Sequence, residues 1–576
     1  MPLPAYMNRL TPEPLPRRRP LRFVLPLLLA FLTTSCGGGL IGDSRSSSRQ
    51  AAEASDAGFP RGPARQVFQT GFKHINELFV EPVSISQIAV HGLKGLKTLD
   101  PDVAIDQTGD QLKITVGQTA LSYKTPADND VRGWAVLTVE ALESGREMSQ
   151  KLRDADSEKL YQIVFEKGLQ DLDRFSHYSG RDQAREERAQ RSGFGGIGVL
   201  LDSKVDGRVF STVSDAPAQR AGVQAGDLII GVDGVSIQGK TNAEIAPLLR
   251  GPIGTSVDVT VQREASAPFA VRIRRSKIVE ESARYRRELG NIAYFKVSTF
   301  NVETASTLIN LLGKARREMG GNMRGIILDL RDNRGGLLDQ GIAVADMFLQ
   351  RGRIMTAGGR HPESQRPYDA AGDDQSGGLP MIVLVNRNSA SSAEIVAAAL
   401  QDQRRALVVG QRSYGKGSIQ NVLPLPNEGD LHITWAKFYG PEGYSLDRLG
   451  VMPSICVREQ GPSAAKVLDD LRNGRIDPLA TIKARRAAAE LPLDQQKIYA
   501  ETCPHLTTQR DREQDLELDI ARALLTEPAL VQRSLRGSMV ATRTSAKQRE
   551  GAALVWPSNL DRPLSVGIVS PPSVNP

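Results

Sequence analysis

The chain has 576 residues, of which 24% are charged and 40% are hydrophobic, and its formal net charge is +7. This composition is typical of globular proteins, leaves room for three or more domains, and excludes a collagen, a polytopic membrane protein and a wholly disordered chain. The excess positive charge lies in residues 1–35 and 530–576, and the body between them is close to neutral. The sequence therefore does not predict a groove that binds nucleic acid.

The N-terminus has the pattern of an export signal. Arginines precede the apolar run 23–32, which is too short to span a membrane core about 30 Å thick, because ten helical residues rise about 15 Å. We interpret residues 1–35 as a signal peptide. Small residues and Cys36 follow, then three glycines, which resembles a bacterial lipoprotein cleavage box; an ordinary secretory signal is the alternative. The expectation is a protein on the periplasmic side of a cell envelope, lipid-anchored to a bacterial membrane through Cys36.

Cysteines are few: the chain contains Cys36, Cys456 and Cys503. If Cys36 takes lipid, two cysteines remain in an exported protein, where disulfides form and persist. The sequence predicts a disulfide between Cys456 and Cys503, and two buried free thiols are the alternative.

The first part of the chain is predicted to be a tether followed by a helical region. Residues 36–70 are rich in Gly, Ser, Ala and Arg and are expected to be a flexible tether. In residues 71–192 apolar side chains such as Phe72 and Ile75 recur at helical spacing. Alternating polar and apolar residues within 100–143 predict a β-hairpin insert in this helical region.

Residues 193–277 are predicted to form a compact unit of short strands and two helices. In the run 216–234, Pro217 can open a short helix, Gly222 can end it, and an apolar strand follows. This passage closely resembles a PDZ domain of the bacterial protease type. In such a domain an extended peptide adds to a sheet edge and its terminal carboxylate binds backbone N–H groups. The resemblance assigns that role to Gly195, Gly196 and Ile197.

Residues 278–458 alternate between apolar strands and helices, which predicts an α/β domain whose strands are covered on both faces. A helical extension is expected at 459–529. Residues 530–576 are rich in Ser, Arg, Pro and Gly, and we expect a disordered basic tail there.

Ser391 is the first candidate for chemistry. A buried strand at 381–385 leads through a polar turn to Ser391, which falls in the first turn of a helix. There a hydroxyl lies at the positive end of the helix dipole beside unpaired N–H groups, which favour negative charge on oxygen. The plain alternative is a capping box formed by Ser391 and Glu394.

Lys416, between two glycines, is the second candidate. To accept a proton, a lysine with a reference pKa near 10.4 must be neutral, which holds for about one molecule in 2,500 at pH 7. Burial lowers such a pKa, so the chemistry requires a dry pocket. Gln420 lies four residues further on, where its amide could hold the amine in place. The alternative is a solvated loop lysine.

Gly335 and Gly336 form the third candidate element. They follow a buried strand and a polar turn, and their N–H groups can approach a reacting carbonyl because no Cβ intervenes. A plain connection between a strand and a helix is the alternative.

Together these three passages resemble the carboxyl-terminal processing peptidases, or tail-specific proteases, which are serine enzymes with a Ser-Lys dyad. The resemblance spans residues 71–458. It implies an α/β multidomain protein: an α/β serine-protease core, a PDZ domain before it and helical parts at both ends. The roles it implies are Ser391 as nucleophile, Lys416 as general base, Gln420 as the residue that positions the lysine, and backbone N–H groups of Gly335, Gly336 and Ser392 as the oxyanion hole.

The resulting expectation is a serine endopeptidase that captures the C-termini of exported proteins and processes or degrades them from that end. Its expected partners are protein or peptide substrates with free C-termini, an adaptor protein, and a membrane if Cys36 carries lipid; nucleic acid is not expected. The alternative is an envelope scaffold with a PDZ domain that binds C-termini without cutting them.

Other chemistries lack their motifs. Neither Gly-x-Ser-x-Gly nor His-Glu-x-x-His occurs, and there is no paired-Cys motif. We therefore expect no cofactor and no metal, and a structural role for His432, which lies in a predicted strand. The six histidines are His74, His91, His177, His361, His432 and His505.

Overall fold

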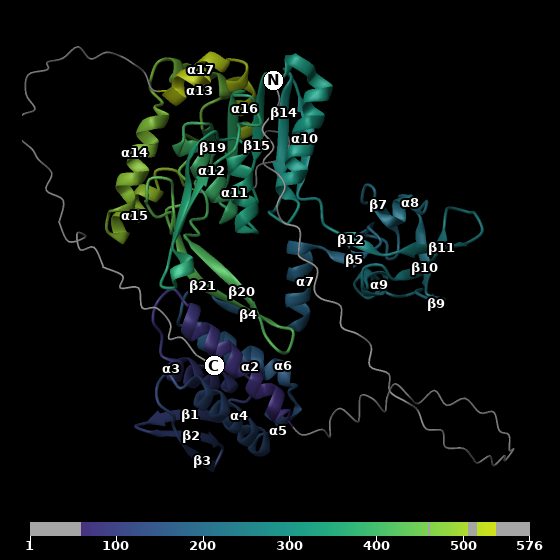
Figure 1. Cartoon of the computed structure of the whole chain (residues 1–576), viewed down its shortest axis with the longest axis vertical. Helices are drawn as coiled ribbons and strands as arrows, with labels where there is room; N and C mark the ends of the chain where they lie inside the picture. Colours follow the sequence, from purple (N-terminus) through teal and green to yellow (C-terminus); the bar gives the residue numbers. More distant parts are fainter. Residues whose placement is uncertain (1–58, 459–460, 505–514, 537–576) are drawn as a thin grey trace, which may run out of the picture. The chain divides into compact units, whose positions relative to one another are not determined.

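The structure, a computed structural model, describes residues 59–458, 461–504 and 515–536 (Figure 1). The expected signal peptide, Cys36 and the last part of the basic tail lie outside these described residues.

The N-terminal region packs helices around an aromatic core. In α2, Phe68 and Phe72 are fully buried at helical spacing, and their rings contact the ring of Phe165 in α6. The elements of this region are α2 (Arg61–Leu78), α3 (Ile85–Lys94), η1 (Gly95–Thr98), β1 (Val103–Thr108), β2 (Gln111–Val116), β3 (Thr119–Lys124), α4 (Val131–Met148), α5 (Gln150–Asp154) and α6 (Ser157–Leu169).

Two predictions for this region were wrong in their bounds. The tether expected up to residue 70 ends earlier, because α2 begins at Arg61 and buries Ala64 and Val67 against the core. The insert expected as a hairpin over 100–143 is a three-stranded antiparallel sheet that ends at Lys124. The rest of that segment is the helix α4, whose Trp134 is fully buried.

Residues 193–277 form the expected unit of short strands with its own apolar core. The pairing of β5 with β12 closes its base, since Phe194 lies opposite Ile278 where the chain enters and leaves. The elements are β5 (Phe194–Gly196), β6 (Val199–Leu201), β7 (Val209–Thr212), α8 (Pro217–Arg220), β8 (Leu228–Val232), β9 (Val235–Ser236), α9 (Asn242–Leu249), β10 (Ser256–Gln262), β11 (Phe269–Arg274) and β12 (Ser276–Ile278).

The following region is built on a six-stranded sheet in the order β13-β14-β15-β18-β19-β22. The first pair is antiparallel and the other neighbours are parallel. The bounds of its strands are β13 (Ala283–Glu288), β14 (Ile292–Val297), β15 (Gly325–Asp329), β18 (Met381–Val385), β19 (Leu407–Gly410) and β22 (Ile455–Cys456).

Both faces of this sheet are covered, as the apolar strands predict. On β15, Ile326 and Leu328 pack into the core shared with one set of helices, and Ile327 packs into the core shared with another. The first set is α10 (Thr304–Met319), with a short η2 (Gly320–Asn322), α11 (Leu338–Asp346) and α12 (Ser392–Asp402); the second set is α13 (Ala464–Arg472), α16 (Leu516–Leu525) and α17 (Pro528–Arg536).

The predicted helical extension therefore supplies one layer of the α/β domain. The prediction of disorder from residue 530 was wrong for its first residues, because Leu530 and Val531 are buried in the core beneath the sheet. Two further helices of this part are α14 (Pro478–Ala489) and α15 (Leu493–Ala500).

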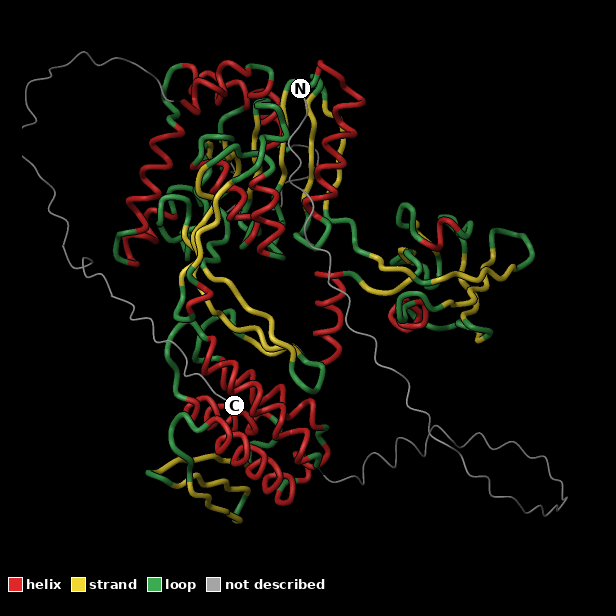
Figure 2. Tube along the Cα trace, in the orientation of Figure 1, coloured by secondary structure: helices red, strands yellow, loops and turns green. Residues whose placement is uncertain are grey.

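A second sheet, in the order β17-β16-β21-β20, contains the long hairpin drawn in Figure 2. β4 (His177–Ser179), which precedes the PDZ-like unit in the chain, pairs with β21. The bounds of the other elements are β16 (Gly352–Gly358), η3 (Pro362–Ser364), β17 (Arg366–Ala370), β20 (Ser418–Pro424) and β21 (Asp430–Tyr439). The N-terminal helical region predicted at 71–192 is thus not a separate unit, because it supplies the strand β4 to this sheet.

A polar helix joins the N-terminal region to the PDZ-like unit. α7 (Arg181–Ser192) joins β4 to the PDZ-like unit, and it buries only Ala184 and Ala189. Such a polar segment has no apolar periodicity to reveal it. In the described part of the chain, no helix combines the length and the apolar character that crossing a membrane requires.

Candidate active site

The residues that the sequence singles out follow three neighbouring strands. β15, β18 and β19 are adjacent and parallel, so their carboxyl ends meet at one edge of the sheet. The loop after β15 contains Gly335, the loop after β18 contains Ser391, and the loop after β19 contains Lys416. The topology brings three motifs that are distant in the sequence to the same edge.

Ser391 is the N-cap residue of α12 and lies in a sharp turn. Its backbone has φ +56° and ψ −119°, a conformation that residues with a side chain rarely adopt. Such strain is concentrated at functional sites. Because Ser392 begins the helix, Ser391 lies at the positive end of the helix dipole, as predicted. The N–H groups of Ala393 and Glu394 are already paired, since they donate to the carbonyls of Ala390 and Ser391. Ser391 and Glu394 also form the capping box that was the alternative interpretation.

Glu394 joins the serine turn to the lysine loop. Its side chain is fully buried, and the backbone N–H groups of Ser391 and Lys416 both donate to its Oε2, each at 2.9 Å. The Gly415 N–H donates to Oε1 at 2.7 Å, and the Ser413 hydroxyl donates to the same oxygen. Burial raises the pKa of Glu394, and these hydrogen bonds oppose that shift. The backbone nitrogens of Ser391 and Lys416 therefore lie within two hydrogen-bond lengths of each other.

Lys416 has the environment that a neutral amine requires. Burial lowers its pKa below the ordinary 10.5, although the charges of Glu394 and Asp173 act to raise it. Its Nζ lies 5.2 Å from the centre of the Phe175 ring, which shields it on one side. The shift has the direction that proton transfer from a serine hydroxyl demands.

Gly415, which precedes Lys416, allows the loop that contains Arg448 to pack closely against it. Gly415 has φ +84°, and a Cβ there would lie 2.8 Å from the carbonyl carbon of Arg448. The Arg448 N–H donates to the Gly415 carbonyl at 3.0 Å. A side chain at 415 would push this loop away and expose the lysine.

The side chains of Ser391 and Lys416 are not hydrogen-bonded to each other in this conformation. Of the hydrogen bonds among the described residues, none joins Ser391 Oγ to Lys416 Nζ. The Gln420 amide donates to Ser418 Oγ at 2.9 Å and to Thr434 Oγ1 at 3.0 Å, and among the described residues no hydrogen bond joins it to the amine. Lys416 precedes β20, the strand that contains Gln420. The role of Gln420 stays a prediction.

The glycine loop after β15 touches the serine. Gly335 has φ +100°, and a Cβ there would lie 2.7 Å from the Cβ of Ser391, so this approach requires glycine. The Gly335 N–H donates to Asn333 Oδ1 at 2.8 Å, and Gly336 forms a parallel bridge with Phe300. The oxyanion role of Gly335, Gly336 and Ser392 stays a prediction, and in this conformation the Gly335 donor is held by its own loop.

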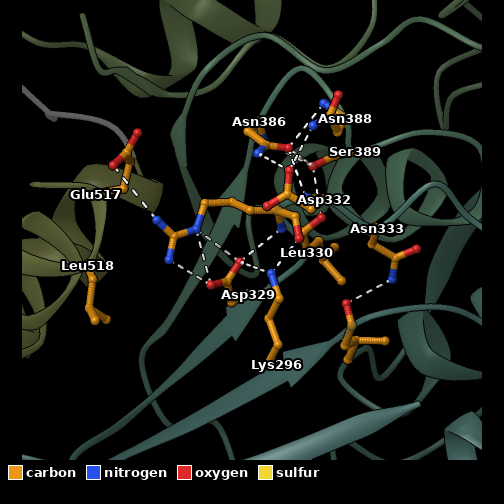
Figure 3. A network of polar contacts seen from close by, with 12 residues as sticks. Lys296, Asp329, Leu330, Asp332, Asn333, Asn386, Asn388, Ser389, Glu517 and Leu518 are labelled. Atoms are coloured by element: carbon orange, nitrogen blue, oxygen red, sulfur yellow. Dashed lines mark hydrogen bonds and ion pairs between the residues drawn. The ribbon is translucent and has the colours of Figure 1, made fainter. Parts of the chain in front are cut away.

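A polar network behind the site links the loops after β15 and β18 (Figure 3). Asp332 accepts hydrogen bonds from the side-chain amides of Asn386 and Asn388, at 2.9 and 2.8 Å. The Ser389 hydroxyl donates to the Leu330 carbonyl at 2.9 Å. These contacts hold Ser391 and Gly335 side by side.

The same network is anchored on a buried carboxylate. Asp329 is 1% exposed and bonds to Arg331, Lys296 and the Tyr294 hydroxyl. Burial alone would raise its pKa, but the Arg331 charge and these bonds hold the pKa below its usual value. No sequence pattern singles out these residues, because their partners come from separate strands.

The predicted carboxylate-binding residues lie in the PDZ-like unit. Gly195 and Gly196 belong to β5, and a Cβ on Gly195 would lie 2.0 Å from the Gly251 carbonyl oxygen, so only glycine fits. Ile197 is buried and its carbonyl accepts from Ala218 N–H. Among the described strands, β6 pairs only with β7, so its other edge is open to an added strand. Binding at these residues stays a prediction.

Cys456 and Cys503, the pair that the sequence selects, form a disulfide with a Cα–Cα distance of 5.8 Å. Cys456 is in β22, the last strand of the main sheet. The bridge therefore ties the end of the sheet to the segment after α15.

Comparison with known proteins agrees with this architecture. Residues 291–457 match the model of peptidase family S41, and residues 209–263 match a PDZ domain. A carboxy-terminal-processing protease of Bartonella bacilliformis is 38% identical over 329 residues, which cover 56% of this chain and 75% of that protein. The chain belongs to peptidase family S41. It is thus a serine-type peptidase of the carboxy-terminal processing group.

Two further proteins are similar to parts of this S41 peptidase. A probable CtpA-like serine protease of Staphylococcus haemolyticus is 32% identical, over 49% of this chain and 56% of that protein. Among solved structures, the photosystem II D1 C-terminal processing protease covers 69% of this chain and 94% of its own, with 22% identity and a TM-score of 0.36. The PDZ domain placed before the protease domain is the order that the sequence analysis expected.

Proposed function

We propose that this S41 peptidase cleaves peptide bonds with Ser391 as nucleophile and Lys416 as general base. The observation that supports this assignment is the Glu394 carboxylate, which binds the backbone N–H groups of both residues through one oxygen. Rotation about the four methylene groups of Lys416 brings its amine to the serine hydroxyl from this starting point. The lowered pKa of the amine supplies the neutral form that a base needs.

In the proposed reaction, the Ser391 hydroxyl oxygen attacks the substrate carbonyl carbon and its proton passes to Lys416 Nζ. The backbone N–H groups of Ser392 and of Gly335 or Gly336 stabilise the oxyanion; for Gly335 this requires release of its bond to Asn333. The protonated lysine then gives its proton to the leaving amine, and an acyl-enzyme remains. Water, deprotonated by the same amine, releases the carboxylate product. Gln420 holds the lysine once its amide leaves Thr434.

The substrate is proposed to be an exported protein or peptide with a free C-terminus. The open edge of β6 accepts the peptide as an added strand, and the loop of Gly195, Gly196 and Ile197 binds its carboxylate. The exposed apolar side chain of Leu200 on β6 favours an apolar C-terminal residue. An adaptor protein that presents such chains belongs to the same proposal.

The proposed location is the periplasmic side of a bacterial envelope, with a lipid on Cys36. Support comes from the signal-like sequence before Cys36 and from the disulfide, which is typical of exported proteins.

The test compares the wild-type chain with Ser391→Ala on an unstructured peptide that ends in apolar residues. We expect cleavage to fall at least about 10³-fold, and we expect Ser306→Ala, a change of an exposed serine on α10, to retain full activity. Equal peptide loss with wild type and Ser391→Ala would contradict the dyad and favour a scaffold that only binds C-termini. Amidation of the peptide's C-terminus tests capture separately: it should slow cleavage by the wild type while leaving the dyad's labelling by a fluorophosphonate intact.

A further inference from the structure

Three side chains outside the candidate active site converge at the junction of β4, β21 and α7. His177 on β4 lies opposite His432 in the antiparallel pairing with β21. Their rings stack, with centres 4.1 Å apart and planes inclined by 12°. Glu187 of α7 places its Oε2 3.0 Å from His432 Nε2. One ligand atom from each of the three residues lies within 4.8 Å of the others.

The His432 nitrogen that faces this cluster is buried without a hydrogen bond. His432 is 7% exposed, and its Nε2 has no partner of hydrogen-bonding geometry among the described residues, although Glu187 is near. Buried polar atoms are nearly always paired. A neutral imidazole has one ring nitrogen with a lone pair, so Nε2 of His432 can offer that pair to a cation.

The other two side chains are oriented by neighbours. His177 Nδ1 lies 2.8 Å from the Phe175 carbonyl oxygen, so this nitrogen holds the proton and Nε2 is left with a lone pair. Glu187 accepts hydrogen bonds from Ser179 Oγ at 3.1 Å and from the Gln183 amide at 2.8 Å. A ring N–H bonded to a backbone carbonyl is the usual support of a metal-binding imidazole.

We propose that His177, Glu187 and His432 bind one divalent cation of the Zn²⁺ type, with solvent in the remaining position. Two imidazoles and a carboxylate are a common ligand set for Zn²⁺, and bonds of about 2.0–2.1 Å place tetrahedral ligand atoms roughly 3.3–3.5 Å apart. His432 Nε2 and Glu187 Oε2 are already at about that separation. His177 is exposed, so it supplies the remaining movement as the stacked rings open.

Neighbouring charges permit such an ion. The guanidinium of Arg191 is 3.7 Å from Glu187 Oε2, but it also pairs with the buried Asp430, as does Arg188. The carboxylate of Asp430 offsets these positive charges, and Glu187 remains available to the cation.

The bound cation would connect elements next to the PDZ domain, which is proposed to capture substrate, with elements next to Lys416, the proposed base. α7 ends at Ser192, directly before the PDZ domain. Phe175, whose carbonyl orients His177, forms part of the wall around Lys416. On β21, Thr434 lies two residues from His432 and accepts from Gln420. The cation thus stabilises the junction between the PDZ domain and the surroundings of the lysine.

The experiment uses the full chain with Ser391→Ala, which prevents self-cleavage, and Cys36→Ser, which removes the thiol outside the disulfide. The chelator-treated protein is titrated with ZnCl₂ by calorimetry, and with CoCl₂ while its visible absorption is recorded. We expect one cation per chain and a higher melting temperature with Zn²⁺. His177→Gln and Glu187→Gln should each weaken binding at least about tenfold. His361→Gln, a change of the partly exposed histidine directly before η3, should bind as the parent does.

His177 is exposed, so His177→Gln should fold, and its circular dichroism without metal should equal that of the parent. Zinc-edge X-ray absorption should report two imidazole ligands in the parent and one in His177→Gln. Absence of saturable one-to-one binding would overturn the proposal. So would binding that His177→Gln and Glu187→Gln leave unchanged, or binding that His361→Gln weakens equally.

Discussion

Two glutamates, Glu394 and Glu187, each join segments that are distant in the sequence, and they do so in different ways. Glu394 is fully buried and accepts four hydrogen bonds, three from backbone N–H groups and one from a hydroxyl. Glu187 is partly exposed and faces a histidine nitrogen that has no hydrogen bond. A carboxylate with a full set of donors fixes a geometry, whereas one beside an unsatisfied nitrogen leaves a place for a cation.

Removal of the Lys416 amine should have the largest effect on kcat. Lys416→Met keeps an apolar chain of similar length and removes the base, so kcat should fall by about 10²–10⁴-fold. Steady-state kinetics on the apolar-ended peptide measures this fall. The unfolding free energy should not decrease, because burial of the amine is unfavourable. Activity of Lys416→Met within tenfold of wild type would show that another residue is the general base.

Glu394→Gln should have the next largest effect. Glutamine has one acceptor oxygen, so an NH₂ group then faces two of the four donors. We expect a loss of about 2–5 kcal/mol in the free energy of unfolding, measured with urea. Displacement of Ser391 relative to Lys416 should lower kcat by about 10²-fold.

Glu187→Gln is the matched control for that change. In metal-free buffer it should cost less than about 1 kcal/mol of unfolding free energy, because the carboxylate is partly exposed. If Glu394→Gln and Glu187→Gln lost equal unfolding free energy, the two carboxylates would not differ in how strongly they stabilise the fold.

The pH dependence of the wild type sharpens the comparison further. Burial lowers the pKa of Lys416 below 10.5, and only the neutral amine accepts a proton. As the pH falls through this lowered pKa, kcat/KM should fall about tenfold per pH unit. Initial rates across a buffer series measure it, and a profile that stays flat into the acid range would exclude lysine as the base.

The last prediction concerns the acid stability of the region around Glu187 and His432. The pKa of His432 is about 4 in the folded chain and 6.5 in the unfolded chain. Between these values the unfolded chain binds a proton that the folded chain does not, so stability falls as the pH falls from 6.5 towards 4. The loss should be at most about 3 kcal/mol. Urea midpoints of metal-free wild type and His432→Gln should converge at low pH; parallel curves would contradict a buried neutral imidazole.

Local sequence patterns predicted much of the fold and of the candidate site. The strands at 325–329 and 381–385 are buried on both faces, so their apolar runs stand out. Ser391 and Lys416 were selected because polar turns and glycines follow such strands. The helix α4 was missed because its segment was assigned to the hairpin insert.

What remained hidden depends on contacts between segments. The capping box of Ser391 and Glu394 was recognised as an alternative, and it is present. The bond from Glu394 to the Lys416 backbone was not foreseen, because it spans 22 residues and follows from the adjacency of β18 and β19. The meeting of His177 with His432 depends on the register of β4 against β21. Periodicity in the sequence contains no information on either pairing.

The pairing of β5 with β12 has a wider consequence. The chain enters the PDZ domain through β5 and leaves it through β12, and these two strands are hydrogen-bonded to each other. The two ends of the domain are therefore adjacent, and its insertion leaves the path of the surrounding backbone uninterrupted. Recombination could swap it for another recognition module, or drop it for a short turn, without refolding the catalytic body. Substrate choice and bond cleavage can therefore diverge independently in the descendants of such a gene.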